Sequence, residues 1–209
     1  MTENALNLDA AYDIKTPADN LRLYAEWARI YDANFAQAMD YVLPDAMATA
    51  FIAAGGMAPV LDLGAGTGLL GTALRRQGLL EIDGTDISQE MLTVAAAKQV
   101  YQRVFSGDLT ARLPVADASY NGVISAGTFT TGHVGPAALD EALRIARSGA
   151  VIGITINAQH WQSAGFAEKF KALTPQITNF SLQDVAIYGA SNTSEHKDDI
   201  GKIALFQKR

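Results

Sequence analysis

The residues best suited to bind a ligand lie in the segment Val60 to Gly68, with the sequence VLDLGAGTG. An apolar run interrupted by one aspartate leads into three alternating glycines, and a helical pattern follows. Glycines let a loop turn tightly and bring its backbone against a ligand, and the N–H groups at a helix start favour negative charge. We interpret the segment as a ligand-binding loop at the carboxyl end of a buried strand, where open α/β sheets hold ligands. The glycines alone leave a second interpretation open, a turn that only packs strand against helix.

Three aspartates at the ends of successive apolar runs sharpen this interpretation. A carboxylate at Asp62 is costly to bury unless loop N–H groups or a ligand cation pair with it. Asp86 follows about twenty residues later, where an acid in this fold can accept both hydroxyls of a ribose. Its alternative role is to cap the next helix beside Ser88. Asp108 can accept from an adenine amino group, although taken alone it is equally consistent with a turn.

The spacing of the glycines distinguishes between cofactors. A dinucleotide fingerprint requires the pattern G-x-G-x-x-G, whereas the residue that follows Gly66-Thr67-Gly68 is Leu69. We therefore expect a ligand that combines adenosine with an ammonium-bearing tail, which would suit the three acids together. An NAD-type oxidoreductase stays as an alternative.

The elements that position these residues have the pattern of a doubly wound α/β sheet. The last two apolar runs are separated by only about ten residues, too few for a helical crossover, so we expect them to pair antiparallel. The chain before them is helical in pattern, with Tyr24, Trp27 and Tyr31 on one helix face. We expect an N-terminal helical lid over 1–56 and one sheet domain over 57–209. The strand candidates are 60–63, 80–85, 101–106, 120–126, 150–156, 184–188 and 200–206, and later helices are expected over 136–149 and 161–173.

The composition excludes several function classes. The 209 residues carry 16 Lys and Arg against 22 Asp and Glu, a formal net charge of −6, which argues against capture of a nucleic-acid backbone. The absence of cysteine removes disulfides, thiolate nucleophiles and cysteine-ligated zinc. The N-terminus has no readable signal peptide, and no apolar run approaches the roughly 20 residues that span a bilayer. We expect a cytoplasmic protein with neither a membrane nor a nucleic-acid partner.

The motif LDLGAGTG and the acids that follow it resemble the class I S-adenosylmethionine-dependent methyltransferases, over about Val60 to Arg209. The resemblance implies a doubly wound, seven-stranded, mostly parallel sheet with an antiparallel last strand, and S-adenosyl-L-methionine as cofactor. More narrowly, Gly132-His133-Val134 and the helix after it look like the methyltransferase-like proteins related to the Williams-Beuren region member. The resemblance and the reasoning above assign these residues to the cofactor: Tyr31, Asp62, Gly64, Ala65, Gly66, Thr67, Gly68, Asp86, Ile87, Met91, Asp108, Leu109, Ser125 and Ala126.

Methyl transfer from a sulfonium is an in-line displacement, so positioning and desolvation can supply most of the acceleration. A general base matters only if the acceptor must lose a proton. His133 is our candidate, because a neutral imidazole suits that task near pH 7, and a loop histidine bonded to a backbone carbonyl is equally consistent. Tyr31 is the second catalytic candidate.

A small-molecule methyl acceptor is expected, bound by Tyr24, Phe129, His133 and His160, with Phe166 also bordering the mouth. No cluster of His, Asp and Glu has metal-ligand spacing, so no metal is expected. The chain is expected to be a monomer or a homodimer. Two alternatives stay open, the NAD-type oxidoreductase and a non-catalytic protein that binds S-adenosyl-L-methionine without turnover.

Overall fold

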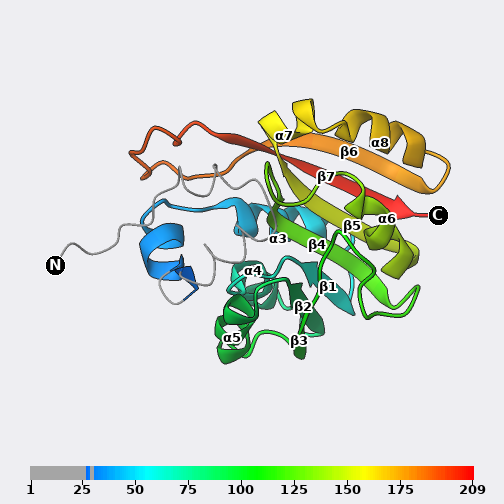
Figure 1. Ribbon diagram of the computed structural model, residues 1–209, viewed down its shortest axis with the longest axis horizontal. Helices are drawn as coiled ribbons and strands as arrows, with labels where there is room; N and C mark the ends of the chain where they lie inside the picture. The colour runs from blue at the N-terminus through cyan, green and yellow to red at the C-terminus, as the bar shows by residue number, and fades with distance from the viewer. Residues whose placement is uncertain (1–26, 29–30) are drawn as a thin grey trace.

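The computed structural model describes residues 27–28 and 31–209, and they are built around one seven-stranded sheet with the strand order β3-β2-β1-β4-β5-β7-β6 (Figure 1). The first five strands pair parallel, and β7 pairs antiparallel with both β5 and β6. This confirms the predicted sheet and its antiparallel last strand. The strands are β1 (Val60–Leu63), β2 (Ile82–Asp86), β3 (Arg103–Ser106), β4 (Tyr120–Phe129), β5 (Ala146–Asn157), β6 (Ile177–Ala186) and β7 (Ile200–Lys208).

Helices cover both faces of the sheet (Figure 1). On one face α3 and α4 share a core with β1, β4 and β5, and on the other face α6 and α8 share a core with the same central strands. Because the central strands are covered on both sides, β1 is buried at all four positions. The helices are η1 (Tyr31–Gln37, a π-helix), α3 (Leu43–Ala53), α4 (Leu69–Arg76), α5 (Gln89–Ala97), α6 (Ala138–Ile145), α7 (Ala158–Ser163) and α8 (Phe166–Leu173).

Local sequence explains how the helices next to the site begin. Pro44 lies in the first turn of α3, where its missing N–H removes no intrahelical bond. The hydroxyl of Ser88 accepts from the backbone N–H of Met91 and caps α5, as predicted. In contrast, α4 begins after Gly68, which is in the left-handed conformation and provides no side-chain cap.

Three predicted boundaries are wrong. The helix expected over 161–173 is two helices, because Gly165 adopts a φ of +80° between them. The helix expected to close at Gly149 ends at Ile145, and β5 begins directly after it. Strand β6 begins seven residues before its predicted start, because most of its side chains are exposed and give no apolar run.

The N-terminal lid can be followed only in part. Tyr24 lies outside the described residues, whereas Trp27 is buried and Tyr31 opens η1. Helix α3 packs Met47 and Phe51 into the same core as β1 and β4, so this part of the expected lid is continuous with the sheet domain. The division at residue 56 stays a prediction.

Candidate functional site

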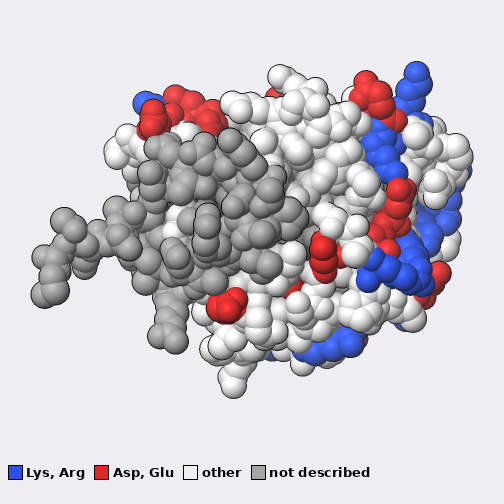
Figure 2. All heavy atoms as spheres, viewed as in Figure 1, with Lys and Arg blue, Asp and Glu red and all other residues white. Residues whose placement is uncertain are grey.

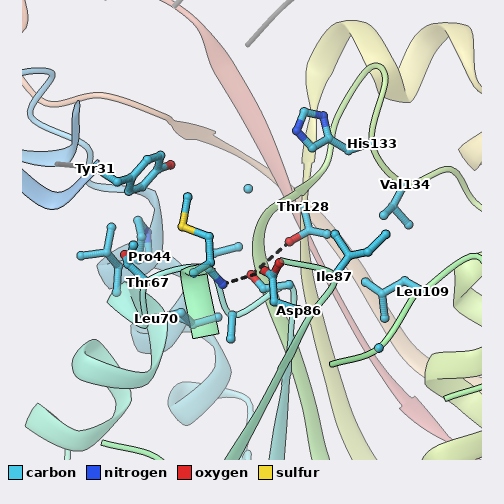
Figure 3. A pocket seen from close by; sticks show the side chains of 18 of the residues that line it. Tyr31, Pro44, Thr67, Leu70, Asp86, Ile87, Leu109, Thr128, His133 and Val134 are labelled. Carbon is cyan, nitrogen blue, oxygen red and sulfur yellow. Dashed lines mark hydrogen bonds between the residues drawn. The ribbon is translucent and has the colours of Figure 1, made fainter. Parts of the chain in front are cut away.

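A pocket opens at the carboxyl ends of β1, β2 and β4, where the glycine loop lies. It holds about 1020 Å³ of space outside protein atoms, part of it open to solvent. Figure 3 shows Tyr31 entering from the N-terminal segment and His133 from the loop after β4, with Asp86 and Thr128 between them. The pocket brings together twelve of the predicted site residues: Tyr31, Gly64, Ala65, Gly66, Thr67, Asp86, Ile87, Met91, Asp108, Leu109, Ala126 and His133.

The glycine loop owes its shape to left-handed backbone at Gly64, Gly66 and Gly68. Its strand-side end is fixed by the N–H groups of Gly64 and Ala65, which both donate to the carbonyl of Thr85. A Cβ at Gly64 would lie 2.1 Å from the side chain of Thr128, whereas one at Gly66 would meet no protein atom within 4 Å. Gly66 therefore presents open backbone to the pocket, which suits a ligand that lies on the loop.

Asp86 holds the glycine loop and faces the pocket. Its carboxylate accepts from the backbone N–H of Gly66 and from that of Ser88, both at 2.8 Å. Burial raises the pKa of this carboxyl, although the N–H groups that it accepts from act in the opposite direction. The N–H of Ile87 also bonds to this carboxylate, and an ionised carboxylate offers about four lone-pair sites, so about one site can still accept a ribose hydroxyl.

Asp108 and Leu109 form the opposite end of the pocket. The Oδ1 atom of Asp108 accepts from both the N–H and the hydroxyl of Thr110, which makes a local turn. Both bonds end on Oδ1, so Oδ2 can accept another donor. Leu109 is buried on the same wall.

Asp62 lies behind the loop instead of in the pocket. Its side chain is fully buried, and Oδ2 accepts from the hydroxyl of Tyr101 at 2.7 Å. The expected pairing of Asp62 with loop N–H groups is therefore wrong; the partner is a tyrosine 39 positions away. Burial raises the pKa of Asp62 to about 7, and the charge of Asp86 adds to the increase.

A hydrogen bond links the N-terminal segment to the glycine loop, and an ion pair links the same segment to the end of α5. The hydroxyl of Thr67 donates to Asp32 at 2.6 Å, and Lys98 pairs with the same carboxylate. Asp32 lies one residue after Tyr31, so this contact fixes the start of η1 beside the pocket.

His133 lies in the loop after β4, next to Val134 in the sequence. His160 lies in α7 behind this loop. Nδ1 of His133 lies 3.2 Å from the carbonyl oxygen of Thr131. A carbonyl only accepts, so this contact assigns the proton to Nδ1 and the lone pair of the neutral ring to Nε2. Nε2 of His160 is 3.0 Å from the carbonyl oxygen of Val134, and its ring packs edge-on against Phe166. Burial lowers the pKa of His133, and His160 lowers it further.

Several assigned residues are structural supports. The buried hydroxyl of Ser125 donates to the carbonyl of Leu63 and joins β4 to β1. Gly68 faces the ring of Tyr101. Phe129 is fully buried and packs against Phe166 in the core, so the structure corrects the expectation that these two rings border the mouth. The predicted acceptor residue His160 is also buried behind this loop.

Sequence reasoning missed part of the pocket wall, notably Tyr41, Pro44, Thr128 and Val134. The run of small residues in the last part of β4 could have indicated Thr128 as a pocket residue. Nothing local marks Tyr41, which reaches the site because its backbone pairs with Tyr188. A Cβ at Gly127 would lie 2.5 Å from the hydroxyl of Tyr41.

The residues present suit S-adenosyl-L-methionine better than a metal ion. The loop backbone is open at Gly66, two carboxylates line the wall, and Ile87, Met91 and Leu109 give it apolar sides. In the part of the chain that the structure describes, no group of three or more His, Cys, Asp or Glu could hold a metal. None of the helices described is both long and apolar enough to cross a bilayer.

Comparison with known sequences finds similarity to methyltransferases. Residues 60–150 match the family described as methyltransferase domain. Methyltransferase-like protein 27 of Homo sapiens is 32% identical over 151 residues, which are 70% of this chain and 61% of that protein, so the chain spans less than two thirds of this relative.

Solved structures give the same fold. The chain resembles a SAM-dependent methyltransferase from Thermotoga maritima, with a TM-score of 0.63 and 15% identity over 90% of this chain and 99% of that one. It also resembles a TehB-like SAM-dependent methyltransferase from Corynebacterium glutamicum, with a TM-score of 0.63 and 20% identity over 90% and 100%. Residues 60–150 therefore match a methyltransferase domain family, and the chain has the fold of the class I methyltransferases.

Proposed function

We propose that the chain transfers the methyl group of S-adenosyl-L-methionine to a small-molecule acceptor. The observation that carries the proposal is the pocket, in which the open glycine loop and Asp86 lie on the floor and Tyr31 and His133 face each other above them (Figure 3). When bound, the cofactor would supply an electrophilic methyl group.

The chain's own residues divide into two groups along this pocket. Gly66, Asp86 and Asp108 would hold the cofactor through backbone and carboxylate oxygens, and Ile87, Met91 and Leu109 would enclose its adenine. Tyr31, Tyr41, Pro44, Thr128, His133 and Val134 line the remaining wall and would enclose the acceptor. This second group consists of aromatic, apolar and uncharged polar side chains, which suit a small organic molecule with one reactive group.

His133 is the base that we propose for an acceptor that must lose a proton. Its lowered pKa keeps the ring neutral at pH 7, because burial disfavours the charged form. The Thr131 contact gives Nε2 the lone pair, and His160 fixes the loop by its bond to the carbonyl of Val134. Both properties favour proton uptake by Nε2.

The charge distribution supports a small acceptor over a nucleic acid. On the face shown in Figure 2, basic side chains of the described residues lie among acidic ones. Arg144 pairs with Glu141 and Asp117, and Lys169 pairs with Asp140. Paired cations add little to the attraction of a phosphate backbone.

We also propose a narrower membership, among methyltransferase-like proteins of the Williams-Beuren region family. The support is Gly132-His133-Val134 and the helix that follows, together with the 32% identity to the human methyltransferase-like protein. The acceptor is not specified by this likeness.

Two measurements test the proposed function. Calorimetry should show binding of S-adenosyl-L-methionine and no binding of NAD. A cell extract is separated into small molecules, protein and nucleic acid, and each fraction is incubated with the protein and a labelled methyl donor. Label should be transferred in the small-molecule fraction. Label confined to macromolecules would contradict the acceptor class, and cofactor binding without any transfer would favour the non-catalytic alternative.

A further inference from the structure

The ring of Tyr101 occupies a slot behind the glycine loop that three glycines leave open. A Cβ at Gly71 would lie 2.5 Å from the ring, and a Cβ at Gly68 or at Gly84 would lie 3.1 Å from it. Gly68 and Gly71 belong to the start of α4, and Gly84 lies in β2. A side chain at position 71 would have to displace the ring, and one at position 68 or 84 would press against it, so the chain is closely packed around Tyr101 at this point.

The hydroxyl of Tyr101 connects the start of α4 to a buried carboxylate. It donates to Oδ2 of Asp62 at 2.7 Å, and the backbone of Gly71 hydrogen-bonds to the same hydroxyl. The first N–H groups of a helix have no intrahelical partner, and a capping side chain normally accepts from one of them. Gly68 at the N-cap has no side chain, so the Tyr101 hydroxyl supplies this acceptor and Asp62 supplies the negative charge that a helix start favours.

We propose that Tyr101 is a positioning residue for the cofactor loop, which replaces the missing cap of α4 and holds the Asp62 carboxylate behind the loop. Asp86 holds the same loop from the pocket side through the N–H of Gly66. The loop is thus fixed between two acids, and Tyr101 connects one of them to the helix. This inference takes only the identity of the cofactor from the proposed function. It does not depend on which molecule accepts the methyl group.

The groups that face Asp62 are Tyr101 and Asp86. Burial raises the pKa of Asp62 to about 7, the bond from Tyr101 lowers it, and the charge of Asp86 raises it. A cofactor that bears a sulfonium and an ammonium favours an ionised carboxylate near its loop. Cofactor affinity should therefore increase from about pH 6 to about pH 8, and loss of the tyrosine hydroxyl should move this increase to higher pH.

The test is calorimetric titration of Tyr101→Phe with S-adenosyl-L-methionine across this pH range. The variant keeps the ring in its slot and loses the bond to a buried charged group, so we expect affinity about tenfold weaker at neutral pH. Tyr120→Phe is the matched control, because the Tyr120 hydroxyl donates to the carboxylate of Asp83 at the same 2.7 Å, and neither residue lines the pocket. The control should keep wild-type affinity and pH dependence.

Each result decides the matter. Wild-type affinity and pH dependence in Tyr101→Phe would overturn the proposal, and so would equal losses in Tyr101→Phe and Tyr120→Phe, which would indicate only general destabilisation. If Tyr101→Phe does not fold, Asp62→Asn takes its place. We then expect weaker binding and a smaller pH dependence, because Asp86 remains as a second buried carboxyl, and wild-type behaviour would count against the proposal. A wild-type chain that binds no S-adenosyl-L-methionine at any pH would refute the proposed function itself, and the inference with it.

Discussion

Substitution of Asp62 by Asn should make the chain without cofactor more stable at neutral pH than the wild type. The Asp62 carboxyl is fully buried, and its pKa is raised from 3.8 to about 7, mainly by burial. A folded-state pKa above the unfolded value means that the folded state binds the proton more tightly. The stability of the wild type is therefore greatest below about pH 4, decreases as the pH rises to about 7, and is constant above that.

The size of this effect follows from the two pKa values. Their difference is 7 − 3.8, or about 3. At about 1.4 kcal/mol for each tenfold change in proton affinity, the free energy of unfolding should decrease by about 4 kcal/mol across this range. Asn has nearly the same shape and its Oδ1 can still accept from Tyr101, but it cannot ionise, so the variant lacks this decrease.

The assay is urea unfolding of both proteins between about pH 4 and about pH 8, with the difference in free energy of unfolding plotted against pH. The difference should grow with pH in favour of Asp62→Asn. Asp45→Asn is the control for net charge, because its exposed carboxylate pairs with Arg76 at the surface. If the curves of the wild type and Asp62→Asn are parallel, Asp62 does not carry a buried charge at neutral pH, and the reasoning fails.

Three further predictions concern the pocket wall. Gly66→Ala should lose about 1–2 kcal/mol of stability, because the φ at this position is +53°. It should also lose most of its cofactor affinity, because the new Cβ would project into the pocket. Thermal melting measures the first effect and calorimetry the second, and unchanged affinity would show that the loop is only structural. Asp86→Ala removes the acceptor of Gly66 and Ser88 and the proposed ribose contact, so affinity should decrease at least tenfold; calorimetry that finds wild-type affinity would contradict the assignment. His133→Ala should lower kcat by about 10²–10⁴-fold if the acceptor must lose a proton. Because burial lowers the pKa of His133, wild-type activity should be constant above about pH 6.5 and decrease only at lower pH; a pH–rate profile that the substitution leaves unchanged would exclude His133 as the base.

The central sheet could be predicted from the sequence because its strands are covered on both faces. Such strands are continuous apolar runs, as in Val60-Leu61-Asp62-Leu63 and in the second half of β5. Strand β6 lies at the edge with mostly exposed side chains, and Ile177, Phe180 and Leu182 are separated by polar residues, so its first seven residues form no continuous apolar run. The break at Gly165 was equally hard to place, since an isolated glycine in a helical pattern is often tolerated.

The site was predictable where its residues are close in sequence or end a strand. The glycines, Asp86 and His133 all follow predicted strands, and the parallel sheet brings their ends to one edge. Tyr41 and Tyr101 could not be found in this way. The position of Tyr41 depends on its backbone pairing with Tyr188. The position of Tyr101 depends on a contact with Asp62, from which α4 and α5 separate it in the sequence. Only the folded chain shows these contacts.

The way the glycine loop is held explains why the chain tolerates an uncapped helix and a buried acid beside its cofactor site. A capping Ser or Asp at position 68 would have to adopt a φ of +91°, which residues with a side chain rarely do. Its side chain would also meet the ring of Tyr101. Moving the cap to Tyr101 and Asp62 places the acceptors behind the loop. The face of the loop at Gly66 is then open to the pocket, so a ligand can contact the backbone there without displacing a side chain of the protein.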